Sequence, residues 1–157
     1  MSPQTQICSA PSYEAFVERD VMVPLRDGVR CATDLYFPAR AGEKVEGQYP
    51  VVLQRTPYDK SAGAATGRYY AERGYVAAMQ DVRGRYQSEG SFYAFAHEGP
   101  DGYDVVEWLA AQPWCDGKVG TFGQSYCAAD QSALASLDPP HPTAMIVTYG
   151  PSSYYHH

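Results

Sequence analysis

Lys118-Val119-Gly120-Thr121-Phe122-Gly123-Gln124-Ser125-Tyr126-Cys127 is the stretch that decides the fold, because an apolar strand runs straight into Gly-x-Ser and a helix-forming segment follows. This order is typical of a nucleophile elbow, a tight turn that holds a serine hydroxyl clear of the backbone. Side chains two positions before and after the serine crowd each other in such a turn, so glycine is usual at both positions. Gly123 fits this pattern, whereas Cys127 replaces the second glycine. Because cysteine is small, we expect the elbow to survive with some strain.

Apolar runs and helix-forming segments alternate on both sides of this turn. The apolar runs are continuous, which suits strands buried on both faces of a parallel sheet, and they cover residues 51–53, 76–79, 119–122 and 144–147. Helices are expected over residues 64–73, 101–111 and 126–137. Strands that alternate with helices predict βαβ crossovers. The expected fold class is therefore α/β, with a mostly parallel sheet and flanking helices.

The N-terminal part shows a different pattern. Val21, Val23 and Leu25 alternate with other residues, Arg26-Asp27-Gly28 supplies a turn, and residues 29–37 form a second extended run. This pattern predicts a β-hairpin ahead of the parallel sheet. Residues 1–16 show no clear periodicity and are expected to form a flexible lead-in, so a single folded unit is expected over residues 17–157.

Composition narrows the class of protein. The 157 residues suffice for one domain with a core, and 12 Lys plus Arg against 18 Asp plus Glu give a net charge of -6. A mildly acidic chain without a basic run lacks the clustered positive charge that binds nucleic acid or an anionic membrane. No apolar stretch approaches the ~18 residues that a membrane helix needs. The 4 cysteines are widely spaced without a CxxC pair and no signal peptide is recognised, which predicts a reduced, cytoplasmic protein.

Further motifs follow one another from about Val21 to Pro151, and together they are far more specific than Gly-x-Ser, which is common by itself. They are Arg26-Asp27-Gly28, Asp34-Leu35-Tyr36, Arg55-Thr56-Pro57-Tyr58-Asp59-Lys60, Gly74-Tyr75, Gln80-Asp81-Val82-Arg83-Gly84, Ser88-Glu89-Gly90, Asp101-Gly102-Tyr103-Asp104, Trp108-Leu109, residues 112–120, and Gly123-Gln124-Ser125-Tyr126 with Gln131. With these motifs the chain resembles the α/β-hydrolase family of cocaine esterase, α-amino-acid ester hydrolases and Xaa-Pro dipeptidyl-peptidases. The resemblance covers the N-terminal portion of the catalytic domain only.

The resemblance implies a serine hydrolase whose nucleophile is Ser125. It also implies two donors to the oxyanion, which are the hydroxyl of Tyr58 and the backbone N–H of Tyr126. A phenol is a neutral donor, and a helix N-terminus favours developing negative charge, so both groups suit the chemistry. The alternative for Tyr58 is a side chain that merely lines the sheet edge. The implied reaction is acyl transfer to Ser125 from a small ester, amide or Xaa-Pro peptide, without metal or cofactor.

The groups that would activate the serine are not identified in the sequence. A serine needs a histidine base oriented by an acid, and in α/β-hydrolases both follow the serine, the acid first. The acid should lie after a later strand and the histidine on a loop beyond that. The candidates after the serine lack the room for this arrangement, and they are Asp130, Asp138, His141, His156 and His157; His97 precedes the serine. The resemblance implies that the cap, the rest of the sheet and a C-terminal β-sandwich are absent. The chain is therefore expected to be a truncated and inactive hydrolase, with an exposed sheet edge that makes it poorly soluble or dependent on a partner.

Several remaining side chains are interpreted as structural. Asp81 and Arg83 are expected to pair with each other and to fix the loop that follows, although a catalytic role at the end of a strand is the alternative. Trp108 and Trp114 are expected to pack in the core. Cys127 is disfavoured as a nucleophile because it lies inside the helix that follows the elbow.

Three hypotheses about function remain. The first is the serine hydrolase, and the second is a non-catalytic pseudoenzyme or interaction module that retains the front half of the fold. The third is a nucleotide-binding α/β domain, which is the weakest because the chain has no P-loop and residues 120–123 are not a dinucleotide fingerprint. Neither the substrate nor the oligomeric state follows from the sequence.

Overall fold

A long hairpin opens the structure. Strand β1 (Glu14–Pro24) pairs antiparallel with β2 (Arg30–Arg40), and Gly28 in the turn between them has a φ of 87°, where glycine is favoured. The predicted hairpin is therefore confirmed. The computed structural model describes residues 9–150. Within this range β1 begins at Glu14, before the expected boundary at residue 17, while residues 1–8 of the expected lead-in lie outside the described residues.

A mostly parallel sheet follows the hairpin. Over the described residues its strand order is β1-β2-β5-β4-β6-β7, with the short β3 (Glu43–Lys44) paired to β2. The parallel strands contain the four predicted apolar runs and are β4 (Tyr49–Thr56), β5 (Val76–Asp81), β6 (Cys115–Gln124) and β7 (Pro142–Thr148). Strand β5 joins them to the hairpin through an antiparallel pairing with β2. The α/β fold class and the arrangement of hairpin and parallel sheet are confirmed.

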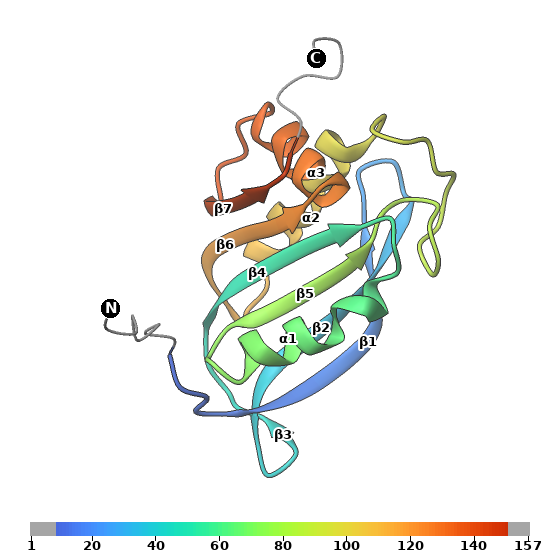
Figure 1. The fold of residues 1–157 in the computed structure, drawn as a ribbon. Coiled ribbons are helices and arrows are strands. Elements are labelled where there is room, and N and C mark those ends of the chain that lie inside the picture. Colours follow the sequence, from blue (N-terminus) through green and yellow to red (C-terminus); the bar gives the residue numbers. More distant parts are fainter. Residues whose placement is uncertain (1–8, 151–157) are drawn as a thin grey trace, which may run out of the picture.

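Helices cover both faces of the sheet (Figure 1). The 3-10 helix η1 (Lys60–Gly63) leads into α1 (Ala64–Ala71) on one face, and α2 (Glu98–Ala110) and α3 (Tyr126–Ala135) pack on the other. Every residue of β5 is buried. Ala77 and Met79 join the core cluster beneath α1, and Val76 and Ala78 join the larger cluster beneath α2 and α3. Burial on both faces explains why the run at 76–79 is continuously apolar.

Helix α2 begins at Glu98, earlier than the expected start at Asp101. The reason is that Gly99-Pro100 lies within its first turn instead of preceding it. Proline is tolerated there because the first backbone N–H groups of a helix have no intrahelical partner. The early start places the Glu98 side chain inside the fold, where it is buried.

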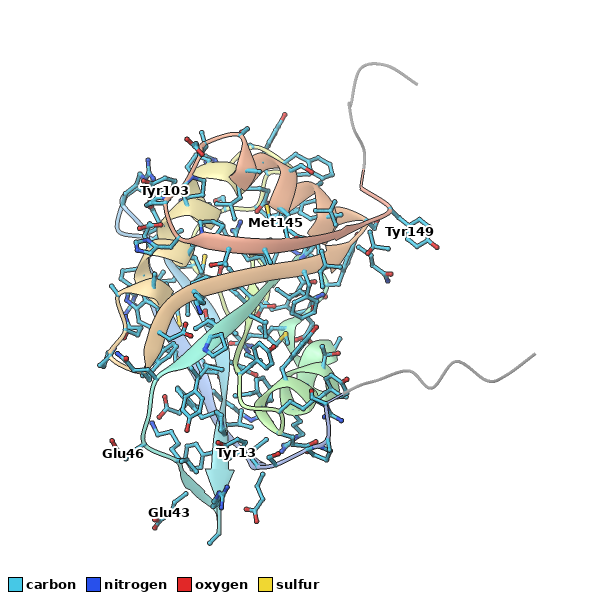
Figure 2. All side chains as sticks on the ribbon, turned by 90° about the vertical axis from the view of Figure 1, so that its left-hand side faces the viewer. Tyr13, Glu43, Glu46, Tyr103, Met145 and Tyr149 are labelled. Atoms are coloured by element: carbon cyan, nitrogen blue, oxygen red, sulfur yellow. The ribbon has the colours of Figure 1, made fainter. Side chains whose placement is uncertain are left out.

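Strand β7 differs from the expectation of burial on both faces. Ile146 is 61% exposed and Val147 is 46% exposed, because β7 is the outermost strand of the described sheet and pairs with β6 alone. Tyr149, just after β7, projects from one end of the molecule, and Glu43 and Glu46 lie at the opposite end (Figure 2).

The cysteine and tryptophan side chains lie where the sequence predicts. Cys31, Cys115 and Cys127 are buried free thiols, while Cys8 is outside the described residues. Trp108 and Trp114 both pack against the larger core cluster. None of the helices described between residues 9 and 150 is both long enough and apolar enough to span a membrane.

Candidate active site at the end of strand β6

Ser125 joins β6 to α3 in a strained backbone conformation. Its φ and ψ are 55° and -119°, a combination that non-glycine residues rarely adopt and that persists only where the surroundings enforce it. The N–H of Ser125 donates to the carbonyl oxygen of Thr148 at 3.1 Å, and its own carbonyl accepts from the N–H groups of Ala128 and Ala129. The turn is therefore held by β7 on one side and by the first turn of α3 on the other.

The side-chain amide of Gln131 stabilises the same turn through hydrogen bonds. Its Oε1 accepts a hydrogen bond from Oγ1 of Thr121 at 2.7 Å, and its Nε2 donates to the carbonyl oxygens of Cys127 at 3.0 Å and Ile146 at 3.1 Å. One buried side chain thus links β6, α3 and β7 around the serine. Gln131 belongs to the motifs that carry the family resemblance, but its role could not be predicted because three of its partners are backbone carbonyl groups.

Cys127 lies in the first turn of α3, opposite Gly123, and is buried. Because Gly123 has no β-carbon, the turn closes without a second glycine. Burial raises the pKa of the Cys127 thiol, which keeps it protonated and poorly nucleophilic. This fits the prediction that Cys127 is part of the helix and not the reacting group.

Tyr58 lies in the loop after β4, and that loop is anchored on both sides of it. Arg85 donates from Nε to the carbonyl oxygen of Pro57 at 3.0 Å, and the backbone N–H of Lys60 donates to Oδ1 of Asp81 at 2.8 Å. The Tyr58 side chain itself is 58% exposed. Its hydroxyl is thus accessible while its backbone is fixed.

The three residues predicted for the site meet at one pocket beyond the carboxyl ends of β4 and β6. This pocket of about 170 Å³ is lined by Tyr58, Phe95, Ser125, Tyr126, Ala129 and Tyr149. The Tyr58 and Tyr126 rings are in edge contact, with centroids 6.4 Å apart and an interplanar angle of 76°. As the first residue of α3, Tyr126 has a backbone N–H without a partner inside the helix. Open α/β sheets collect ligands at this end of their strands.

The expected pair of Asp81 with Arg83 is wrong. Asp81 instead accepts from the backbone N–H groups of Lys60 and Gln87, which holds the loop that carries Tyr58. Arg83 forms a bidentate ion pair with Asp101 of α2, in which its Nε and Nη2 lie 2.9 and 2.7 Å from the two carboxylate oxygens. Its Nη1 also lies 2.7 Å from Oδ2 of Asp27 in the hairpin turn. Strand β5 ends at Asp81 and Arg83 lies in the turn that follows it, so the two side chains do not share one strand face and each finds a partner elsewhere.

Beneath the elbow the structure buries charged side chains that the sequence analysis did not predict. Arg55, Glu98 and Asp130 are 5%, 4% and 3% exposed. Burial raises the pKa of Asp130 to about 8, an effect that Arg55 opposes and Glu98 strengthens. With its carboxyl group buried beside Arg55, Asp130 is not available to orient a histidine at the pocket.

The described histidines lie elsewhere. His97 is the residue just before α2, and Nδ1 of His141 lies 2.7 Å from Oε2 of Glu107. Within residues 9–150 no histidine lines the two pockets to which Ser125 contributes. His156 and His157 fall outside the described residues. The same part of the chain contains no cluster of three or more His, Cys, Asp or Glu side chains suited to a metal ion.

Comparisons with known proteins agree with this architecture. The family described as X-Pro dipeptidyl-peptidase (S15 family) matches residues 27–157. Cocaine esterase from Rhodococcus sp. (strain MB1 Bresler) is 41% identical over 121 residues, an alignment that covers 73% of this chain and 20% of the esterase.

Two solved structures show the same fold. A CocE/NonD family hydrolase from Staphylococcus aureus superposes with a TM-score of 0.76 at 31% identity, covering 87% of this chain and 28% of the hydrolase. An α-amino acid ester hydrolase gives a TM-score of 0.75 at 28% identity, covering 96% of this chain and 29% of that protein. The chain thus spans between 20% and 29% of the length of these relatives.

Proposed function

The chain belongs to the X-Pro dipeptidyl-peptidase (S15) family, and we propose that it carries the nucleophile and the oxyanion hole of a serine hydrolase that cleaves carboxylic esters or amide and peptide bonds. The observation that carries this proposal is the convergence of Ser125, Tyr58 and Tyr126 on one pocket, with Ser125 in a strained turn between strand and helix. Such a turn lifts a hydroxyl away from the backbone and toward a bound carbonyl.

In the proposed reaction, Oγ of Ser125 attacks the carbonyl carbon of the substrate and loses its proton to a base. The negative charge that develops on the carbonyl oxygen is stabilised by the N–H of Tyr126 and the hydroxyl of Tyr58. Neutral donors fixed in this way can stabilise a transition state by about 3–4 kcal/mol each. The tetrahedral intermediate collapses to an acyl-serine while the protonated base gives its proton to the leaving group, which departs as the alcohol or amine. Water then hydrolyses the acyl-serine by the same steps.

The base and its acid are proposed to come from the part of the relatives' length that these 157 residues do not span. Neither described histidine lines a pocket at Ser125, and the matched relatives are much longer than the region they share with this chain. On this proposal the 157 residues alone are catalytically inactive. The reaction needs only a small ester, amide or peptide substrate and no metal or cofactor. Free, buried thiols support the proposed cytoplasmic location.

A fluorophosphonate probe, which modifies only an activated serine, tests the proposal. The probe would be applied to the 157-residue chain and to the complete product of its gene, each as wild type and as Ser125→Ala. Ser132→Ala is the matched control, because Ser132 lies on the same helix and its hydroxyl donates to the carbonyl of Ala128 in that helix. We expect labelling of the complete product that Ser125→Ala abolishes and Ser132→Ala leaves intact. A folded complete product that does not label would instead favour the non-catalytic module.

A further inference from the structure

An ion pair is buried directly behind the elbow. The Arg55 guanidinium, at the end of β4, lies 3.1 Å from Oε2 of Glu98 and donates to the Glu98 carbonyl oxygen at 2.9 Å. Its Nε donates to Oε1 of Gln80 on β5 at 3.0 Å. Both charged side chains are almost fully buried. Arg55 and Gln80 thus fix the position of Glu98, the first residue of α2.

Glu98 in turn holds the side chain of Tyr126. The Tyr126 hydroxyl donates to Oε1 of Glu98 at 2.8 Å and accepts from the backbone N–H of Phe95 at 3.0 Å. The Tyr126 ring stacks on the Phe95 ring, with centroids 4.4 Å apart and an interplanar angle of 23°. A phenol fixed by a donor, an acceptor and a stacked ring has little freedom to rotate.

Stability alone does not account for this ion pair. Removing two charges from water costs free energy that their attraction only partly returns, and apolar side chains of similar volume often serve a core equally well. The pair must also coexist with other buried carboxyl groups, since Asp101 lies 4.0 Å from Arg55 and Asp130 is buried beside it. What the pair achieves is geometric, because it fixes the side chain at the first position of α3.

We propose that Glu98, held by Arg55, is a positioning residue of the oxyanion hole, a step that rests on the proposed function. The backbone N–H of Tyr126 is one proposed donor, and its direction follows from how the residue is fixed. The Tyr126 ring also contacts the ring of Tyr58, whose hydroxyl is the other proposed donor. One buried hydrogen bond, from Tyr126 to Glu98, therefore aligns both donors without itself touching the substrate.

Tyr126→Phe is the sharpest test, because it removes the anchored hydroxyl and keeps the ring and the backbone N–H. The matched control is Tyr49→Phe, which removes a hydroxyl bonded to the carbonyl of Val45 at the other end of β4. Both variants of the complete gene product would be assayed with p-nitrophenyl acetate. For Tyr126→Phe we expect kcat to fall about 10- to 100-fold with KM changed less than about threefold, since loss of a whole donor costs about 100- to 1,000-fold. Tyr49→Phe should match the wild type.

A transition-state analogue separates positioning from general destabilisation. A trifluoromethyl ketone forms a tetrahedral oxyanion on a reactive serine, so its Ki should rise by the same factor by which kcat falls in Tyr126→Phe. Glu98→Gln keeps an oxygen that can accept from Tyr126 and should retain more activity than Glu98→Ala. An active wild type whose kcat and Ki are unchanged by Tyr126→Phe would overturn the positioning role alone. The same holds if Tyr49→Phe reproduces the loss. A wild type without Ser125-dependent hydrolysis would instead overturn the proposed function.

Discussion

Gly123 and Cys127 face each other across the elbow so closely that a β-carbon at Gly123 would lie 2.5 Å from the β-carbon of Cys127 and 2.8 Å from its carbonyl oxygen. Real β-carbons do not approach this closely, so the first glycine of the turn is required by contact distance. The second position can accept a cysteine only because the first has no side chain. The departure from the usual glycine pattern is thus compensated within the turn itself.

Gly123→Ala should therefore lower the free energy of unfolding by about 3 kcal/mol, the upper range for overpacking a tight site. Cys127→Gly alone should cost about 1 kcal/mol, because glycine is unfavourable inside a helix. Combined with Gly123→Ala it should restore part of the stability by removing the closest contact. A double-mutant cycle from denaturant unfolding measures this coupling. Gly123→Ala with wild-type stability would contradict the contact.

Asp130 should make the stability of the protein depend on pH. Its pKa is raised to about 8 by burial, from an ordinary value near 4 in the unfolded chain. Between these values the folded state holds a proton that the unfolded state has released, so the contribution of Asp130 to stability is greatest below about pH 4 and falls as pH rises to about 8. Asp130→Asn, which is uncharged at every pH, should remove this slope.

The measurement is the difference in free energy of unfolding between wild type and Asp130→Asn at several pH values. Between pH 5 and pH 8, we expect the free energy of unfolding of the variant to rise by ~2–4 kcal/mol relative to that of the wild type. Asp116→Asn, at an exposed position, serves as the control. A pH-independent difference would show that Asp130 is ionised in the folded state throughout.

Iodoacetamide should modify the three described cysteines slowly in the folded protein. Burial raises the pKa of Cys31 to about 11 and also raises those of Cys115 and Cys127, so few thiolates exist at pH 8. Mass spectrometry before and after denaturation would measure the modification. Rapid alkylation of Cys127 in the folded state would revive the possibility of a cysteine nucleophile.

The ion pair between Arg83 and Asp101 should contribute more to stability than the one between Arg30 and Glu89. Both ion pairs are bidentate, but the pair of Arg83 with Asp101 is largely buried whereas the pair of Arg30 with Glu89 is exposed to solvent. A double-mutant cycle with Arg83→Gln and Asp101→Asn should give a coupling of about 3 kcal/mol. The cycle with Arg30→Gln and Glu89→Gln should give a clearly smaller coupling that added salt abolishes. Equal couplings would count against the importance of burial.

The exposed edge at β7 should make the 157-residue chain prone to self-association. Ile146 and Val147 present apolar side chains along an edge strand, an arrangement that invites pairing with another chain. Val147→Lys should lower light scattering at a given concentration. Gln48→Lys adds the same charge outside β7, at an exposed position just before β4, and should have little effect. Monodisperse wild type at high concentration would refute this expectation.

Several parts of the fold could be predicted from the sequence because local patterns dictate them. The runs at 51–53 and 76–79 are apolar on both faces, and the turn at Gly28 requires a residue that accepts positive φ. The start of α2 could not be placed, because Gly99-Pro100 is typical of a helix boundary and fits a first helical turn equally well.

The network behind the site could not be predicted, for a different reason. Arg55, Glu98 and Tyr126 are distant in the sequence, and a charged residue is exposed far more often than it is buried. Only the strand order, which places β4 between β5 and β6, brings them together. The positions of Ser125, Tyr58 and Tyr126 followed from the motifs, whereas the contacts that fix them did not.

The hydrogen bond from Ser125 to Thr148 also sets an order of events during protein synthesis. The chain emerges from the ribosome N-terminus first, so Ser125 and α3 are exposed before the strand that supplies Thr148. Until that strand is added beside β6, the amide of Ser125 lacks the carbonyl that holds its strained backbone. The turn at Ser125 is therefore among the last features of this segment to mature in the nascent chain, and a polypeptide released before Thr148 would carry this turn in a relaxed conformation.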